Sequence, residues 1–267
     1  MTDPWRLDGS APEIYERYRV PGEFEPLARL FLTRMGLQRG ERVLDVACGT
    51  GIVARLAAAQ VGESGHVTGL DINEAMLDVA RAKGSGSSTL EWRTGEAGSL
   101  PFAEREFDVV LCQQGLQFFA DKLTALREML RVLTPGGRLG LAVWQSLEHD
   151  PYGLVIADAL SRHVSQDAAD RAGHALGDES ELRALLVEAG FCEVQIRTER
   201  LVRTMGPPHE SVAMQLASSG RLAAIVGALS AEARAKLFSD IITALQPFRH
   251  GQGLRIPRGT FIALARR

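Results

Sequence analysis

The stretch that most constrains this chain is residues 43–51, Val-Leu-Asp-Val-Ala-Cys-Gly-Thr-Gly. It begins with residues that favour a buried strand, and a carboxylate, Asp45, stands where that strand should end. Glycines at 49 and 51 permit a sharp turn, and residues 52–60 are predicted to form a helix. A strand, a tight turn and a helix N-terminus together predict a site for part of a nucleotide-like ligand.

Strands and helices alternate along the chain from about residue 40. Apolar runs predict strands at residues 42–46, 66–70, 90–93, 107–112 and 139–144. Helical periodicity predicts helices at residues 52–60, 74–83 and 122–133. Asn73 is the expected N-cap of the second helix, and Pro-Gly-Gly at 135–137 is expected to end the third. This alternation predicts a parallel sheet with helices on both faces.

The second half of the chain is less regular. It predicts a helix from Asp178 to Glu188, a strand at 191–200, a mostly helical stretch at 207–248 with breaks near 218–220 and Ser230, and a last strand at 259–265. We therefore expect one domain over residues 1–267, with a helical cap over the ends of the strands. The predicted core comprises about residues 40–144, 178–204 and 257–267, and the predicted cap about residues 11–30, 145–177 and 205–256.

Composition narrows the class of protein. The net charge is -3 with acids and bases interspersed, so no basic face predicts a nucleic-acid partner. No apolar run reaches membrane-spanning length, and the N-terminus lacks the pattern of a signal peptide. The cysteines at 48, 112 and 192 lie far apart, which indicates reduced thiols, and no metal-ligand spacing is present. We expect a cytoplasmic enzyme without a metal; its oligomeric state stays open, with a homodimer among the alternatives.

Two cofactors compete for the glycine turn. Residues 49–54 fit the dinucleotide pattern G-x-G-x-x-A, and Asp71 follows about twenty residues later, where an acid binds a ribose. A third interpretation is that the glycines only permit close packing of strand and helix. Asp45 would repel a pyrophosphate but attract an ammonium and a sulfonium. S-adenosylmethionine carries both cations, and its carboxylate suits a helix N-terminus. Electrostatics therefore favours S-adenosylmethionine.

The motifs that follow support this choice. Residues 43–51 resemble motif I of the class I S-adenosylmethionine-dependent methyltransferases, with Ala47 in place of the first glycine of D-x-G-x-G-x-G. The resemblance continues through residues 69–76, 95–102, 107–108 and 133–137, and it is to the small-molecule type found in ubiquinone and menaquinone biosynthesis. It covers about residues 40–144, and residues 11–30 resemble the N-terminal helix of the family. It implies an α/β fold, a Rossmann-like three-layer sandwich with a mostly parallel seven-stranded sheet, its last strand antiparallel, and a helical cap.

The resemblance also implies roles for individual residues. Asp71 would accept hydrogen bonds from the ribose hydroxyls, Ile72 and Met76 would flank the adenine, and Glu96 with Ala97 would read its edge. Glutamate at 96 departs from the aspartate common in the family. The full set of expected cofactor contacts is Asp45, Ala47, Gly49, Thr50, Gly51, Asp71, Ile72, Met76, Gly95, Glu96, Ala97, Gln113, Gln114 and Tyr18.

The expected reaction is transfer of a methyl group from S-adenosylmethionine to a small organic acceptor by in-line displacement. A general base is needed only if the acceptor must lose a proton; His149 is the candidate, with a surface role as its alternative. Candidates for contact with an apolar or aromatic acceptor are Tyr15, Gln117, Phe118, Trp144, Tyr152 and Met214. Two other functions stay open at this point: a nicotinamide-dependent oxidoreductase, and a catalytically silent protein that only binds S-adenosylmethionine.

Overall fold

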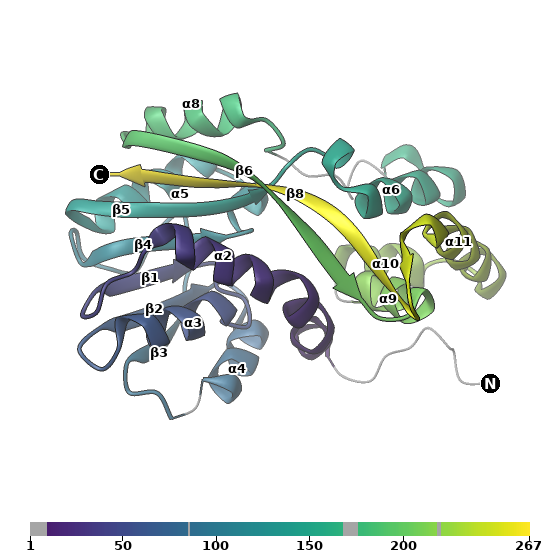
Figure 1. Ribbon diagram of the computed structural model, residues 1–267, viewed down its shortest axis with the longest axis horizontal. Coiled ribbons are helices and arrows are strands. Elements are labelled where there is room, and N and C mark those ends of the chain that lie inside the picture. The colour runs from purple at the N-terminus through teal and green to yellow at the C-terminus, as the bar shows by residue number, and fades with distance from the viewer. Residues whose placement is uncertain (1–9, 85, 168–175, 218–219) are drawn as a thin grey trace. The chain divides into compact units, whose positions relative to one another are not determined.

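The chain divides into two compact units. The computed structural model describes residues 10–84, 86–167, 176–217 and 220–267 (Figure 1). The sheet unit comprises residues 24–144, 175–199 and 260–267, and the helical unit comprises residues 1–23, 145–174 and 200–259. Residues 24–30 and 176–177, expected in the cap, fall in the sheet unit, and residues 200–204 and 257–259, expected in the core, fall in the helical unit.

The sheet follows the predicted alternation. Its strands in the described residues are β1 (Arg42–Val46), β2 (His66–Asp71), β3 (Leu90–Thr94), β4 (Phe107–Gln113), β5 (Leu133–Trp144), β6 (Cys192–Met205), β7 (Arg249–His250) and β8 (Gly253–Arg266). Their order is β3-β2-β1-β4-β5-β8-β6, and β7 pairs with β8 outside this path. Strands β1 to β5 pair in parallel, whereas β8 runs antiparallel to β5. The mostly parallel sheet with an antiparallel last strand is confirmed, and the two-residue β7 is an unpredicted addition.

Helices cover both faces of the sheet. The helices of the sheet unit are α2 (Glu25–Met35), α3 (Ile52–Val61), α4 (Glu74–Lys83), η2 (Leu116–Phe118), α5 (Lys122–Val132) and α8 (Glu179–Ala189). Leu139 and Leu141 of β5 belong to the apolar core shared with α5 and α8. Gly140, which points the other way, has no room for a Cβ because Met35 and Phe31 of α2 pack against it. The alternation along β5 thus separates two helical layers, with α2 drawn in front of the strands in Figure 1.

Two details of the expected elements were tested by the structure. The Asn73 side chain accepts from the Ala75 amide at 3.1 Å, which confirms this N-cap of α4. The expected end of the next helix was wrong: α5 ends at Val132, and β5 begins at Leu133 instead of Leu139. The amide of Glu106 donates to the Val132 carbonyl at 2.8 Å, and Leu133 already pairs with Phe107. Strand pairing therefore begins before the glycines that were expected to end the helix.

The helical unit has its own apolar core. Its helices are α1 (Ala11–Ile14), η1 (Tyr15–Phe24, whose last residue belongs to the sheet unit), η3 (Leu147–His149), α6 (Pro151–His163), α9 (Pro208–Ala217), α10 (Gly220–Gly227), α11 (Ala231–Ala244) and η4 (Gln246–Phe248). The predicted break at Ser230 is confirmed, since this residue caps α11; the break predicted near 218–220 falls on residues 218–219, outside the described residues. No helix in the described ranges is long and apolar enough to cross a bilayer.

A cluster of buried charges lies inside the helical unit. Both Arg203 and Arg258 donate to Glu23, which also accepts from Arg19 at 3.1 Å. Arg258 Nη2 lies 3.0 Å from the carboxylate of Asp150. Burial alone would raise the pKa of Glu23, but the guanidinium groups of Arg203, Arg19 and Arg258 lower it to about 2. Glu23 is therefore ionised at neutral pH and joins η1 to β6 and β8.

Replacing Glu23 by Gln is expected to destabilise the protein by about 3–5 kcal/mol at pH 7, because it leaves buried guanidinium groups without their shared carboxylate. The Glu23 pKa is lowered on folding, so its stabilisation is present above the model-peptide value of 4.5 and is lost as the pH falls toward 2. Denaturant unfolding at several pH values measures this. Glu25→Gln is the control, because its ion pair with Arg29 is exposed and should contribute less than about 1 kcal/mol. Equal effects of the two variants would contradict the prediction.

Candidate cofactor site

The glycine turn between β1 and α3 has the backbone of a tight corner. Ala47, Gly49 and Gly51 have φ values of 57°, 55° and 83°, all in the left-handed region. The Cys48 amide donates to the Leu70 carbonyl of β2 at 3.0 Å, and the Gly51 amide donates to the Cys48 carbonyl at 2.9 Å. Ala47 stands where the family has glycine, and its left-handed conformation costs about 1–2 kcal/mol. The turn is thus held by β2 although one of its residues is strained.

The two glycines of this turn have different surroundings. A Cβ on Gly51 would overlap the indole of Trp92, which also fills the space beside Gly69. Gly51 therefore serves close packing, as the alternative interpretation of the glycines expected. A Cβ on Gly49 would meet no atom within 4 Å. Gly49 therefore leaves its backbone open to a ligand, which packing alone does not explain.

Asp45 is a buried carboxyl group beneath the turn. It is 1% exposed, and its Oδ2 accepts from the Ala54 amide in the first turn of α3 at 3.0 Å. Burial raises the pKa of Asp45 to about 8; the Ala54 hydrogen bond opposes this shift, and the charge of Asp71 adds to it. A ligand cation next to this group would restore its ionised form.

Asp71 joins the end of β2 to the turn. One carboxylate oxygen accepts from the Gly49 amide at 2.8 Å, and the other accepts from the Asn73 amide at 2.9 Å. Each carboxylate oxygen has two lone pairs, so both can accept one more hydrogen bond. The two amides fix the orientation of the carboxylate and leave it able to accept from a pair of hydroxyl groups.

Several buried polar groups near these strand ends have no hydrogen-bond partner in the described part of the chain. They are Thr50 Oγ1, Gln113 Oε1, Gln114 Oε1, and both amide atoms of Gln117. Gln113 donates to the Phe24 carbonyl and Gln114 donates to Thr260, each at 3.3 Å, so these two side chains are held in place through their nitrogen atoms. Buried polar atoms without partners are rare in proteins and indicate a ligand or ordered water.

The expected adenine contacts lie on the same unit. Ile72 is 69% exposed, unusual for a large apolar residue directly after a buried strand, whereas Met76 is half-buried. The Gly95 amide donates to the Asp71 carbonyl at 3.0 Å. Glu96 is exposed and Ala97 is buried in the core. The connection after β3 is thereby attached to the end of β2.

The residues expected to contact the acceptor fall into both units. In the sheet unit, Gln117 is buried and Phe118 is 76% exposed. Trp144 is buried, and its ring centre lies 6.2 Å from that of Phe24. In the helical unit, Tyr152 is buried and its hydroxyl donates to the Ser211 carbonyl at 3.2 Å.

The other candidates in the helical unit differ in exposure. Tyr15 is half-buried with the Arg19 guanidinium 5.6 Å from its ring centre. His149 is exposed, with Nε2 at 3.7 Å from Glu148. Tyr18 and Met214 are brought together, because both line one pocket.

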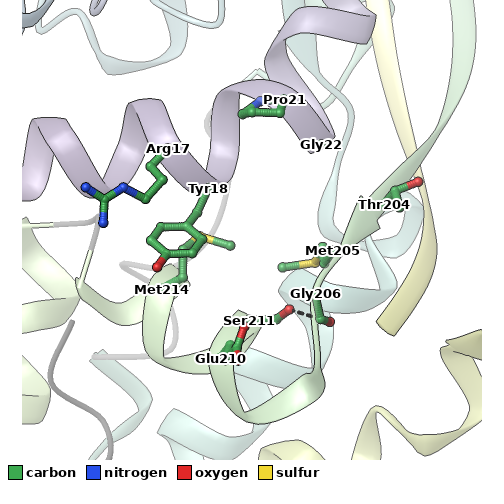
Figure 2. Close-up of a pocket in the computed structure, with 10 residues that line it drawn as sticks. All are labelled: Arg17, Tyr18, Pro21, Gly22, Thr204, Met205, Gly206, Glu210, Ser211 and Met214. Atoms are coloured by element: carbon green, nitrogen blue, oxygen red, sulfur yellow. Dashed lines mark hydrogen bonds between the residues drawn. The ribbon is translucent and has the colours of Figure 1, made fainter. Parts of the chain in front are cut away.

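This pocket, within the helical unit, has a volume of about 400 Å³. Figure 2 shows its lining, which comes from η1, the end of β6 and α9. Tyr18, Pro21, Met205 and Met214 make most of the lining apolar, and Ser211 donates to the Gly206 carbonyl at 2.9 Å. Of these residues, only Tyr18 and Met214 were expected from the sequence to contact a ligand. The others carry no motif: those before and after Tyr18 lie on η1, and those at 204–211 line the pocket because a turn and a helix follow β6.

The two buried cysteines have no features of a nucleophile. Burial raises the pKa of the Cys48 thiol well above its usual range, and the charges of Asp45 and Asp71 add to this effect. Burial likewise raises the pKa of Cys112 to about 12. Both groups are therefore neutral thiols at pH 7 and serve packing.

Comparisons with known proteins agree with this geometry. The sequence model of the family described as "Methyltransferase domain" matches residues 44–141. The ubiquinone/menaquinone biosynthesis C-methyltransferase of Pseudomonas paraeruginosa is 35% identical over 181 residues, which span 62% of this chain and 71% of that protein. The demethylmenaquinone methyltransferase of Staphylococcus aureus is 32% identical over 181 residues, or 61% of this chain and 73% of that protein. This chain belongs to the class I S-adenosylmethionine-dependent methyltransferases, of the ubiquinone/menaquinone-biosynthesis type.

Solved structures agree with the fold. A putative methyltransferase from Bacillus halodurans aligns with a TM-score of 0.58 and 25% identity over 88% of this chain and 96% of that one. The phosphoethanolamine N-methyltransferase 2 of Haemonchus contortus, solved in complex with S-adenosyl-L-methionine, aligns with a TM-score of 0.57 and 20% identity over 90% of this chain and 52% of that one. Together with the curated relatives, the family shows an S-adenosylmethionine-dependent methyltransferase for a small molecule, and the oxidoreductase is not favoured.

Asp45→Asn is expected to weaken cofactor binding and to stabilise the ligand-free protein at pH 8. The Asp45 pKa is raised on folding, so its ionisation costs stability increasingly as the pH rises from the model-peptide value of 3.8 to about 8. Without ligand, the variant should melt about 2–4 °C above the natural protein at pH 8 and at the same temperature near pH 4. Its affinity for S-adenosylmethionine should fall at least about tenfold, because the neutral amide cannot pair with the ammonium. Calorimetric titration giving an unchanged Kd would contradict this role.

Thr50→Val is expected to weaken binding without harming the fold. The change removes a buried hydroxyl that has no partner in the described residues, so stability of the ligand-free protein should stay equal or rise by about 1 kcal/mol. Affinity for S-adenosylmethionine should fall about fivefold to tenfold, since a hydrogen bond to the ligand carboxylate is lost. Thr33→Val, on the exposed side of α2, is the matched control and should leave the Kd unchanged. Equal affinities for both variants would exclude the contact.

Proposed function

We propose that the acceptor of this methyltransferase is an aromatic, quinone-type small molecule whose apolar part binds in the pocket of the helical unit. The observation that carries the proposal is this pocket of about 400 Å³, lined by Tyr18, Pro21, Met205 and Met214. Apolar pockets with a few polar groups are typical of sites for small organic ligands. Two relatives, named a ubiquinone/menaquinone biosynthesis C-methyltransferase and a demethylmenaquinone methyltransferase, support the same class of acceptor.

We propose that residues of the sheet unit bind the separate groups of the cofactor. Asp45 would pair with the ammonium of S-adenosylmethionine, and Thr50 with the open backbone at Gly49 would receive its carboxylate. Asp71 would accept from the ribose hydroxyls. The exposed Ile72 would cover the adenine, with Met76 beside it.

The remaining contacts come from the strand ends. Gly95, Glu96 and Ala97 would bind the adenine edge, and Gln113 with Gln114 would complete the site through their free carbonyl oxygens. Ala47 and Gly51 shape the turn itself. The chain then supplies binding, alignment and exclusion of water.

The chemistry requires few catalytic groups. When bound, S-adenosylmethionine supplies a methyl group on a sulfonium, which a nucleophilic atom of the acceptor displaces in line. Rate enhancement can come from alignment and exclusion of water. The relative from Pseudomonas paraeruginosa is named a C-methyltransferase, and transfer to a ring carbon also requires removal of the proton on that carbon. We keep His149 as the candidate for this base. We further propose that the protein acts in the cytoplasm and that its acceptor is not a nucleic acid; its free cysteines and mixed charge support this.

The direct test is methyl transfer to reduced 1,4-naphthoquinone, followed by mass spectrometry of the product after incubation with labelled S-adenosylmethionine. The proposal expects one methyl group per product molecule, on a ring carbon. Transfer to oxygen would keep the acceptor class and exclude the carbon site. Absence of turnover with an aromatic panel, while the cofactor binds, would favour the silent binding protein.

Tyr18→Ala tests the role of the pocket. Loss of this half-exposed ring should raise the KM for the naphthoquinol about tenfold and change the Kd of S-adenosylmethionine less than about twofold. Leu154→Ala is the control, because Leu154 is similarly exposed in the same unit but does not line the pocket. If the variant instead binds S-adenosylmethionine more weakly and keeps the KM for the acceptor, Tyr18 contacts the cofactor, as the family resemblance implies.

A further inference from the structure

A second, smaller cavity lies inside the helical unit. Its volume is about 40 Å³, and its lining includes Asp150, Tyr152, Arg203 and Arg258. A buried water needs about 10–15 Å³ of such volume, so the cavity has room for a few waters or one small polyatomic ion. None of the functions derived above uses this cavity.

Arg203 has the feature that points to a ligand. Its side chain is 4% exposed and lines the cavity. One of its terminal nitrogens, Nη2, donates to Glu23, whereas Nε and Nη1 have no hydrogen-bond partner in the described part of the protein. A guanidinium group has five N–H donors and no acceptor, so a buried one requires oxygen atoms or anions around it. On this side the Tyr152 ring lies over the guanidinium, 5.1 Å from its central carbon, but no oxygen of the described residues bonds Nε or Nη1.

The charges around the cavity favour an anion over water. Two guanidinium groups line it, those of Arg203 and Arg258, against the single carboxylate of Asp150. Glu23 does not restore the balance, because its one carboxylate is shared among three arginines. Burial, together with the nearby charge of Arg203, lowers the pKa of Arg258 to about 10, so both arginines stay charged at pH 7. The lining therefore attracts one negative charge.

We propose that this cavity binds one small monoanion of the carboxylate type, held by Arg203 with Arg258 beside it. Guanidinium groups are the side chains best suited to carboxylates, and the cavity is large enough for a carboxylate group alone. A free ion such as formate and the carboxylate of a larger molecule share this chemistry. The proposal concerns the helical unit and does not depend on the identity of the methyl acceptor.

Thermal unfolding of the full chain in chloride-free buffer tests the site, with sodium formate and sodium benzoate as probes and sodium methanesulfonate, which carries no carboxylate, as the balancing salt. Formate should raise the melting temperature saturably by about 2–4 °C. A response to formate alone identifies a free ion, and a response to benzoate as well identifies the carboxylate of a larger molecule. No saturable response to either probe would overturn the proposal and leave a water-filled cavity.

Two variants with opposite expected effects on the binding of formate make the test specific. Arg203→Met should abolish the response to formate, whereas Asp150→Asn, which removes the negative charge of the lining, should increase the affinity for formate about tenfold or more. Arg34→Met, which affects an ion pair with Glu199 in the sheet unit, is the control and should respond as the natural protein does. If formate raises the melting temperature of Arg203→Met as much as that of the natural protein, the proposal is overturned. If that variant fails to fold, an unchanged or weaker affinity in Asp150→Asn would do so.

Discussion

The sheet unit depends on the hydrogen bonds that the Asp71 carboxylate accepts from two backbone amides. Through Gly49 this group holds the turn after β1, and through Asn73 it holds the start of α4. Two βα connections are thus fixed by one side chain at the end of β2. The left-handed conformation of Ala47 and the open face of Gly49 persist because the turn is held from both sides. The group that builds the corner is therefore also the group that we propose for the ribose hydroxyls.

Much of the sheet unit could be predicted, because its signals are local. Alternating apolar strands and helices with clear caps gave the parallel sheet, and Asn73 was recognised from its position alone. The start of β5 at Leu133 could not be predicted, since it depends on pairing with β4 and not on the glycines at 136 and 137. Likewise the two-residue β7 exists because β8 extends to Gly253 and offers it a partner. Boundaries set by a distant strand carry no signal in their own residues.

The residues of the candidate sites also divide into those that local sequence signals reveal and those that depend on distant partners. Asp45, Gly49 and Asp71 could be selected because their spacing is tied to a turn, and the structure gives each a geometry suited to a ligand. The buried arginines were missed, although one signal was available. Arg258 occupies the inward register of a strand whose alternate residues, Leu254 and Ile256, are buried. A charged residue in an inward register predicts a buried partner, but it does not reveal that the partner is Glu23, which is far away in sequence.

The packing of Trp92 has a practical consequence. Its indole lies against both Gly51 and Gly69, so it touches the turn and the strand that holds it. Indole emission depends on the polarity and rigidity of its surroundings. Once Trp5 and Trp144 are replaced by Phe, the protein would therefore contain an intrinsic optical reporter at its glycine corner, and movements of this corner could be followed by fluorescence without any attached label.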